Sequence, residues 1–401
     1  MNMTRLLTLF LLLSSATAAL AANDLTGVVV DAASKPLPGA HVYIYTAMPK
    51  EGFSPLCPYC YRDCGKQEAV SKKGSFKIKS LDKSLLFNVL AVADGFEPAF
   101  ARDVDPAHGP VTIRLEPRSA ADADRLITGT VVDPKGKPVV GALVESNGYH
   151  MDRGVGFGMP GVEKLSITDG KGAFALRIPS PTALLDVRVT ARSYAPMIER
   201  LLVPGEPRTI HVAEGAAVTG TLVKDGKPVP RARVAFVQRN RASDGYLGRF
   251  EIGTNERGQF VMPDLGPNQT YVVYSPMEGL AGGVVEAKIV EVKDPKSTTD
   301  AGTLAVVPGR RVAGKVVVPE GMTIPPHSKI LLVSNTADDR RNVEIDDDGS
   351  YVFQPVPQEK ARIIARLPGL TDGRRAPGRP AFTNVPAKGD VDNLEIVMVR
   401  Q

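Results

Sequence analysis

The stretch Leu25-Thr-Gly-Val-Val-Val-Asp31 decides the fold, because it recurs along the chain. The copies are Ile127-Thr-Gly-Thr-Val-Val-Asp133, Val218-Thr-Gly-Thr-Leu-Val-Lys224 and, more faintly, Val312-Ala-Gly-Lys-Val-Val-Val318. Their starts are 102, 91 and 94 residues apart, a period that matches one small domain rather than one unit of a solenoid. The sequence therefore predicts a row of four related domains.

Each copy continues with the same elements in the same order. A Lys-Pro turn follows the first strand in three copies, and a strand that alternates apolar and polar residues comes next, as in residues 40–44. A polar turn then ends in Gly, and an aromatic residue stands two positions later. The four pairs are Gly74 and Phe76, Gly172 and Phe174, Gly258 and Phe260, and Gly349 and Tyr351. Short strands separated by turns predict antiparallel β-sandwiches, and we expect the four aromatic residues to anchor their cores.

The composition agrees with an all-β protein that has several cores. The chain has 401 residues, 43% of them hydrophobic, with 38 Gly, 33 Pro and a formal net charge of +5. So many turn-forming residues argue against helical bundles, and the apolar content argues against disorder. Because Lys and Arg are scattered, we expect no nucleic acid partner. The predicted segments are a signal peptide at 1–21, followed by domains at 22–118, 125–215, 216–309 and 310–401.

The first 21 residues have the features of a cleaved Sec signal peptide. One basic residue, Arg5, precedes an apolar run from Leu6 to Leu13, and small residues stand at 19–21. The apolar run is too short to cross a bilayer, and no later segment reaches eighteen apolar residues. We therefore expect a mature chain without a transmembrane segment, located in the periplasm of a bacterium or secreted.

The repeated motifs resemble those of carboxypeptidase regulatory-like domains, a family related to transthyretin-like and collagen-adhesin B-type sandwiches. The resemblance rests on Thr-Gly-x-Val-Val-Asp, on the Lys-Pro-x-x-Gly-Ala element at Lys35–Ala40 and Lys137–Ala142, and on the turn Asp169–Phe174. It covers nearly all of the mature chain and is weakest in the fourth copy. It implies seven-strand prealbumin-like sandwiches that accompany other proteins and perform no chemistry. We accordingly expect no enzymatic activity.

All three cysteines lie in one insert of the first domain, Cys57-Pro-Tyr-Cys60-Tyr-Arg-Asp-Cys64. In an oxidising compartment, a disulfide between two of them is the first interpretation, and the sequence does not show which two pair. A metal site is the second, with Asp63 or His41 as a fourth ligand. Cys-Pro-Tyr-Cys is also the dithiol motif of glutaredoxins, although the βαβ context of that motif is missing. No other cofactor is expected.

Three inserts interrupt their domains at the same position, between the second strand and the Gly-aromatic turn. They span about 46–71, Gly148–Gly161 and Arg239–Gly253. Loops on a rigid β scaffold commonly carry binding residues, so we expect a recognition surface there. The candidate residues are Tyr59, Tyr61, Tyr149, Phe157 and Tyr246. The leading hypothesis is a non-catalytic binding or spacer protein of the cell envelope with a protein or carbohydrate ligand, and the alternative is a thiol-based metal or redox site in the first domain.

Overall fold

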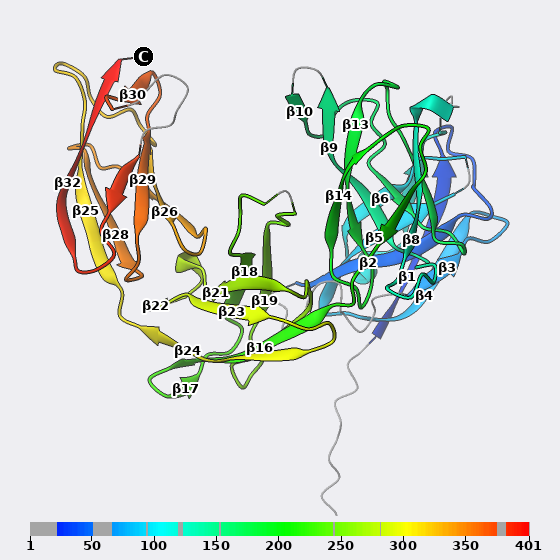
Figure 1. Cartoon of the computed structure of the whole chain (residues 1–401), viewed down its shortest axis with the longest axis horizontal. Coiled ribbons are helices and arrows are strands. Elements are labelled where there is room, and N and C mark those ends of the chain that lie inside the picture. Colours follow the sequence, from blue (N-terminus) through cyan, green and yellow to red (C-terminus); the bar gives the residue numbers. More distant parts are fainter. Residues whose placement is uncertain are drawn as a thin grey trace, which may run out of the picture.

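The computed structural model describes residues 22–50, 66–93, 95–118, 123–151, 154–243, 245–280, 282–374 and 382–400. The described residues form eight β-sheets, which pair into four sandwiches in chain order. Sandwiches 1 and 2 lie side by side as one arm of a U, sandwich 3 forms its base and sandwich 4 forms the other arm (Figure 1). The predicted signal peptide at 1–21 lies outside the described residues. Within the described ranges, no helix has the length and apolar character needed to cross a membrane.

Sandwiches 1 and 2 cover the first half of the chain. The strands of sandwich 1 are β1 (Ala22–Asp31), β2 (His41–Pro49), β3 (Gln67–Ala69), β4 (Ser75–Asp82), β5 (Leu85–Val92), β6 (Ala99–Val104) and β7 (Val111–Leu115). The strands of sandwich 2 are β8 (Leu126–Val132), β9 (Leu143–Met151), β10 (Gly154–Gly156), β11 (Leu165–Ile167), β12 (Ala173–Arg177), β13 (Leu184–Thr190), β14 (Met197–Leu202) and β15 (Arg208–His211). Two 3-10 helices, η2 (Pro106–His108) and η3 (Ala123–Arg125), lie in the connections.

Sandwiches 3 and 4 follow the same plan with a few added strands. Sandwich 3 contains β16 (Ala216–Lys224), β17 (Lys227–Pro228), β18 (Arg233–Gln238), β19 (Arg249–Gly253), β20 (Gln259–Leu265), β21 (Gln269–Tyr274), η4 (Met277–Gly279), β22 (Val284–Val285), β23 (Lys288–Val292) and β24 (Thr298–Val307). Sandwich 4 contains β25 (Arg310–Val317), β26 (Lys329–Ser334), β27 (Arg340–Glu344), β28 (Ser350–Val356), β29 (Ala361–Arg366), β30 (Leu370–Asp372), β31 (Thr383–Val385) and β32 (Val391–Arg400).

The common unit has the predicted seven strands. In sandwich 1, a three-stranded sheet in the order β4-β1-β7 faces a four-stranded sheet in the order β3-β2-β5-β6. The opening strand of each sandwich pairs in parallel with its closing strand, as β1 pairs with β7. The sequence patterns predict antiparallel pairing only and do not predict this parallel pair. The two strands stand at opposite ends of a domain, so no turn between them marks their pairing in the sequence. The predicted all-β class is confirmed by this strand pairing.

The repeated Gly of the opening strand makes room for the repeated aromatic residue. Gly27, Gly129, Gly220 and Gly314 are register partners of Phe76, Phe174, Phe260 and Tyr351, respectively. A Cβ on Gly27 would lie 2.6 Å from Cζ of Phe76 and 2.3 Å from the Val111 carbonyl oxygen of the parallel strand. The other three sites are similarly crowded. All four aromatic side chains are at most 5% exposed, which confirms the prediction that they anchor the cores.

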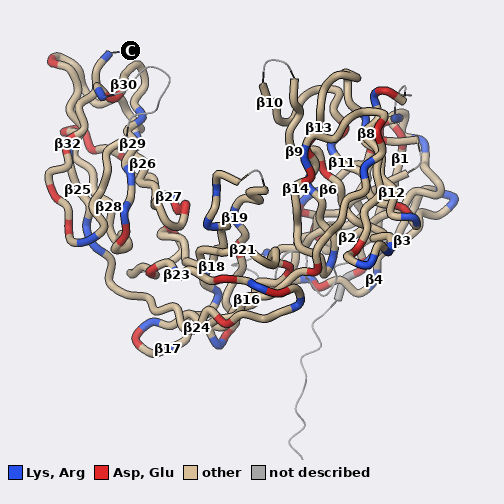
Figure 2. Tube along the Cα trace, viewed as in Figure 1, with Lys and Arg blue, Asp and Glu red and all other residues tan. Residues whose placement is uncertain are grey.

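Each sandwich has its own hydrophobic core, and every ladder in the described part of the chain joins strands of one repeat. The domain limits at 22–118, 125–215, 216–309 and 310–401 remain predictions. Charges of both signs are interspersed along the whole tube in Figure 2.

Sandwiches 3 and 4 are joined by buried contacts. Met277 of η4 packs in the core of sandwich 4, and its backbone N–H donates to Oδ2 of Asp339 over 2.7 Å. The Met277 contacts therefore join the base of the U to its second arm. Arg310, the first residue of β25, is buried within sandwich 4 and donates to the carbonyl oxygens of Pro357, Gly389 and Glu359 of the same sandwich.

Candidate functional site: a pocket between sandwiches 1 and 2

The predicted cysteine site falls outside the described residues. Cys57, Cys60, Cys64 and Asp63 all lie in 51–65, as do the recognition candidates Tyr59 and Tyr61. The remaining candidate ligand, His41, is exposed at the start of β2. Within the described ranges, no three His, Cys, Asp or Glu side chains gather as a metal site would require.

The other recognition candidates have different surroundings. Phe157, just after β10, is 74% exposed, and its role in recognition stays a prediction. Tyr149 is 4% exposed in the core of sandwich 2, so its prediction as a recognition residue is wrong. A β-bulge where β9 pairs with β13 shifts the alternation of β9 and turns Tyr149 inward.

The third insert is occupied by contacts within the chain. Tyr246 is half-buried against a cluster that includes Tyr274 of sandwich 3 and Ala337 of sandwich 4. Arg241 of the same insert donates to the carbonyl oxygens of Asn335 and Thr336 over 2.7 and 2.8 Å. The described part of this insert therefore joins two sandwiches rather than presenting Tyr246 as a free recognition residue.

Sandwiches 1 and 2 pack through the outer faces of their larger sheets. Two ion pairs flank the contact: Arg118 Nη2 lies 2.5 Å from Glu163 Oε1, and Arg177 Nη2 lies 2.7 Å from Glu97 Oε1. The Glu163 side chain is almost fully buried, so its charge depends on Arg118 and on the backbone N–H of Arg177. The apolar part of the contact is formed by Tyr43, Tyr45, Leu90, Val92 and Phe100 from sandwich 1 and by Leu143, Leu165 and Ile167 from sandwich 2.

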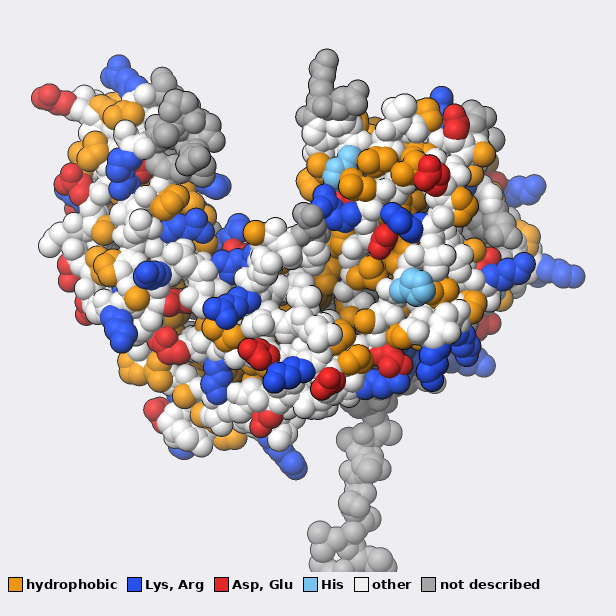
Figure 3. Space-filling view, viewed as in Figure 1, with side chains coloured by type: hydrophobic (Ala, Val, Ile, Leu, Met, Phe, Trp, Pro, Cys, Tyr) orange, Lys and Arg blue, Asp and Glu red, His pale blue; other side chains and the backbone are white. Residues whose placement is uncertain are grey.

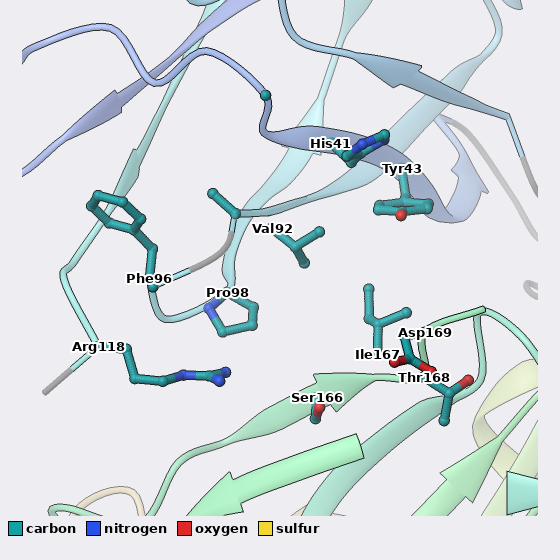
Figure 4. A pocket seen from close by; sticks show the side chains of 13 residues that line it. His41, Tyr43, Val92, Phe96, Pro98, Arg118, Ser166, Ile167, Thr168 and Asp169 are labelled. Carbon is teal, nitrogen blue, oxygen red and sulfur yellow. The ribbon is translucent and has the colours of Figure 1, made fainter. Parts of the chain in front are cut away.

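Beside this contact, the two sandwiches leave an open pocket of about 380 Å³ (Figure 4). Its volume falls within the range of known ligand pockets, which often form at domain interfaces. Aromatic and apolar side chains form part of the wall, and hydroxyl groups and charges form the rest. The lining residues are Gly39, His41, Tyr43, Val92, Ala93, Gly95, Phe96, Pro98, Arg118, Ser166, Ile167, Thr168 and Asp169.

Backbone hydrogen bonds hold the loops that form the pocket. Gly95 has a φ of 80°, and its carbonyl oxygen accepts from the Arg118 N–H over 2.7 Å. This bond ties the segment after β7 to the turn that carries Phe96. On the opposite side, the Thr168 hydroxyl accepts from the Ala142 N–H over 2.8 Å and donates to the Val139 carbonyl over 2.6 Å. Both sides of the pocket are thus anchored to their own sandwiches.

Neighbouring groups determine the ionisation and the pairing of the titratable side chains in the pocket. The backbone N–H groups of Ala173 and Lys171 hold the pKa of Asp169 below its ordinary value, so this carboxylate is ionised at neutral pH. Burial raises the pKa of Tyr43, which keeps its phenol protonated. Arg118 is compensated by Glu163. The pocket therefore offers hydrogen bonds and aromatic surface without a large charge of one sign.

The arrangement suits binding better than catalysis. His41 and Ser166 line opposite sides of the pocket (Figure 4), whereas a base and its nucleophile must lie within hydrogen-bond reach. The Ser166 hydroxyl accepts from the Ala175 N–H over 3.3 Å, and the Thr168 hydroxyl is used within sandwich 2. The pocket therefore offers a ligand a concave surface of apolar, aromatic and polar side chains.

Most of these residues were missed by the sequence analysis. Of the predicted site residues that the structure describes, only His41 lines the pocket. Phe96, Arg118 and Thr168 lie in turns and connections that carry no motif, and they meet only because two sandwiches pack together. The Asp169 turn was identified, but as a repeat feature rather than as part of a site.

No protein-family model and no curated protein matches the chain. Solved structures that match this chain include the Bacillus anthracis TIE protein, at 11% identity over 90% of this chain and 68% of that one, with a TM-score of 0.20. A streptococcal ancillary pilin is 12% identical over 69% of this chain and 100% of its own, with a TM-score of 0.22. Two B repeat units of the collagen binding protein of Staphylococcus aureus are 11% identical over 95% of this chain and 100% of theirs, with a TM-score of 0.20. Scores this low carry no argument about function, and membership in the carboxypeptidase regulatory-like family remains a prediction.

Proposed function

We propose that this chain is an exported, non-catalytic protein that binds a partner protein through the pocket between sandwiches 1 and 2. The observation that supports this proposal is the pocket itself, which is open, has a volume of about 380 Å³ and is lined by both sandwiches. The signal-like residues 1–21 support export to the periplasm or the medium.

The lining favours a protein segment as the ligand. Val92, Phe96, Pro98 and Ile167 can bury an apolar side chain of the partner. The hydroxyl group of Tyr43 and the charged groups of the pocket can bond the polar backbone beside it. Because Arg118 is already neutralised by Glu163, the pocket has no strong preference for an anionic ligand.

Photo-crosslinking from the pocket tests this proposal in the producing cells. A photoreactive phenylalanine analogue at Phe96 should form one discrete adduct with a second protein. The same analogue at Val352, which is 42% exposed on β28 of sandwich 4, is the matched control and should form none. An adduct from Val352 alone, or no adduct from Phe96 under conditions in which the chain co-purifies with a partner, would refute this location for the binding site.

A further inference from the structure

One charged group in the wall of the pocket is not part of an ion pair. Asp169, in the turn after β11, is exposed and lines the pocket. Its Oδ1 atom accepts from the backbone N–H groups of Lys171 and Ala173 over 2.8 and 2.9 Å, whereas its Oδ2 atom makes no hydrogen bond or ion pair with any described residue. Arg118, the lining residue of opposite charge, is already paired with Glu163. The unbalanced charge of the pocket is therefore negative.

The fold does not require a carboxylate at this position. The same turn occurs in sandwiches 1 and 3, where Ser71 and Asn255 take the place of Asp169. The Ser71 hydroxyl accepts from the backbone N–H groups two and four residues later, and Oδ1 of Asn255 does the same over 2.9 Å in both bonds. A neutral oxygen therefore closes the same turn, so the negative charge of Asp169 is available to a ligand.

The groups around Asp169 suit an organic cation. In Figure 4, the ring of Tyr43 lies across the pocket from Ile167 and Asp169. The face of an aromatic ring attracts a cation, and so does a carboxylate. Val92 and Pro98 add apolar wall, which can pack against the methylene groups of a long basic side chain. The pocket thus offers contacts to both parts of such a side chain.

Charges outside the pocket give no strong bias of either sign. The formal net charge is only +5 over 401 residues. On the face drawn in Figure 3, basic and acidic side chains are interspersed over most of the surface. The lining of the pocket therefore decides which charge it prefers.

We propose that the pocket binds a basic side chain, lysine or arginine, of the partner protein. The cationic group lies between Oδ2 of Asp169 and the ring of Tyr43, and the methylene groups pack on the apolar wall. An acidic side chain would be repelled by Asp169, and a neutral one would leave its charge unpaired. This inference rests on the proposed function, because it names the part of the partner that enters the pocket.

Three small probes test this preference on the full-length chain: N-acetyllysinamide, N-acetylargininamide and N-acetylnorleucinamide, whose side chain is apolar. Binding is followed by NMR shifts of the amides of residues 166–169. Both basic probes should saturate and should bind about 5-fold more tightly than the norleucine probe. The difference should shrink in about 1 M salt, which screens the charge of an exposed carboxylate. The tighter of the two basic probes identifies the preferred side chain.

Asp169→Asn and Asp133→Asn form a matched pair of variants. Oδ1 of Asp133 closes the equivalent turn after β8 with two backbone bonds of 2.8 Å, and Asp133 does not line the pocket. Asp169→Asn should weaken both basic probes about 5-fold and leave the norleucine probe unchanged, whereas Asp133→Asn should affect none of them. Equal effects of the two substitutions, or basic probes that bind no more tightly than norleucine, would overturn the proposal.

The crosslink from Phe96 separates this inference from the proposed function. If Asp169→Asn leaves the yield of the adduct unchanged, the basic side chain is refuted while the partner-binding site stands. If the basic probes bind and depend on Asp169 but Phe96 gives no adduct, the cation site is supported and the protein partner is refuted.

Discussion

Gly129→Ala should destabilise sandwich 2 far more than an ordinary Gly→Ala substitution. The new Cβ would lie 2.2 Å from the Arg208 carbonyl oxygen of the parallel strand β15 and 2.8 Å from Cε1 of Phe174. The first contact is with backbone held in a ladder, so neither atom can move without breaking strand pairs or the core. Overpacking of a core costs about 1 to 3 kcal/mol, and a clash with paired backbone belongs at the upper end, about 3 kcal/mol.

Gly170→Ala is the matched control, because a Cβ there meets nothing within 4 Å and its φ is not positive. It should change stability by less than about 1 kcal/mol. Native-state hydrogen exchange read by mass spectrometry suits this test, since it gives the opening free energy of each sandwich in the intact chain. Equal and small effects of the two substitutions would refute the argument that Gly129 is required by the aromatic residue and the parallel strand.

Three further predictions concern other parts of the chain. Phe260→Ala should destabilise sandwich 3 by about 3 to 5 kcal/mol in the same exchange experiment, because it removes a buried ring that packs edge to face against Phe236. A loss of stability below about 1 kcal/mol would contradict the role of Phe260 as a core anchor. Burial raises the pKa of Asp339 to about 6, above the value of an Asp in the unfolded chain. Between about pH 4 and pH 6 the folded protein therefore holds a proton on Asp339 that the unfolded chain has lost. The free energy of unfolding of sandwich 4, measured in urea, should fall as the pH rises through this range. Asp339→Asn should remove this slope, and an unchanged slope would assign it to other groups. Alkylation of the exported protein should find one free thiol per chain without reductant and three after reduction. Three reactive thiols without reductant would exclude the disulfide. Thiols that react only after a chelator is added would favour the metal site.

The sequence was most informative where a feature repeats and acts locally. The Gly-aromatic pairs were predicted as core because an aromatic residue two positions after a turn glycine alternates inward, and Phe76 and its three equivalents are buried. Tyr149 was predicted as a recognition residue because it lies in an insert. It instead belongs to β9, and a bulge in the pairing of β9 with β13 turns its side chain into the core, a shift that the sequence pattern does not reveal.

The pocket between sandwiches 1 and 2 could not be predicted, for a different physical reason. Arg118 and Glu163 are 45 residues apart and pair only because two sandwiches dock. The way neighbouring domains pack depends on the shape and burial of their outer faces, and single-chain periodicity carries no signal for it.

Hydrogen exchange of the full-length chain, with and without the partner identified by crosslinking, tests the central claim most directly. The amides of residues 95–98, which carry the Phe96 turn, and of 166–169 should exchange more slowly in the complex, while those of β25 to β32 in sandwich 4 should be unchanged. Protection confined to sandwich 4, or a complex that leaves both pocket segments unprotected, would contradict the proposal that the partner binds between sandwiches 1 and 2.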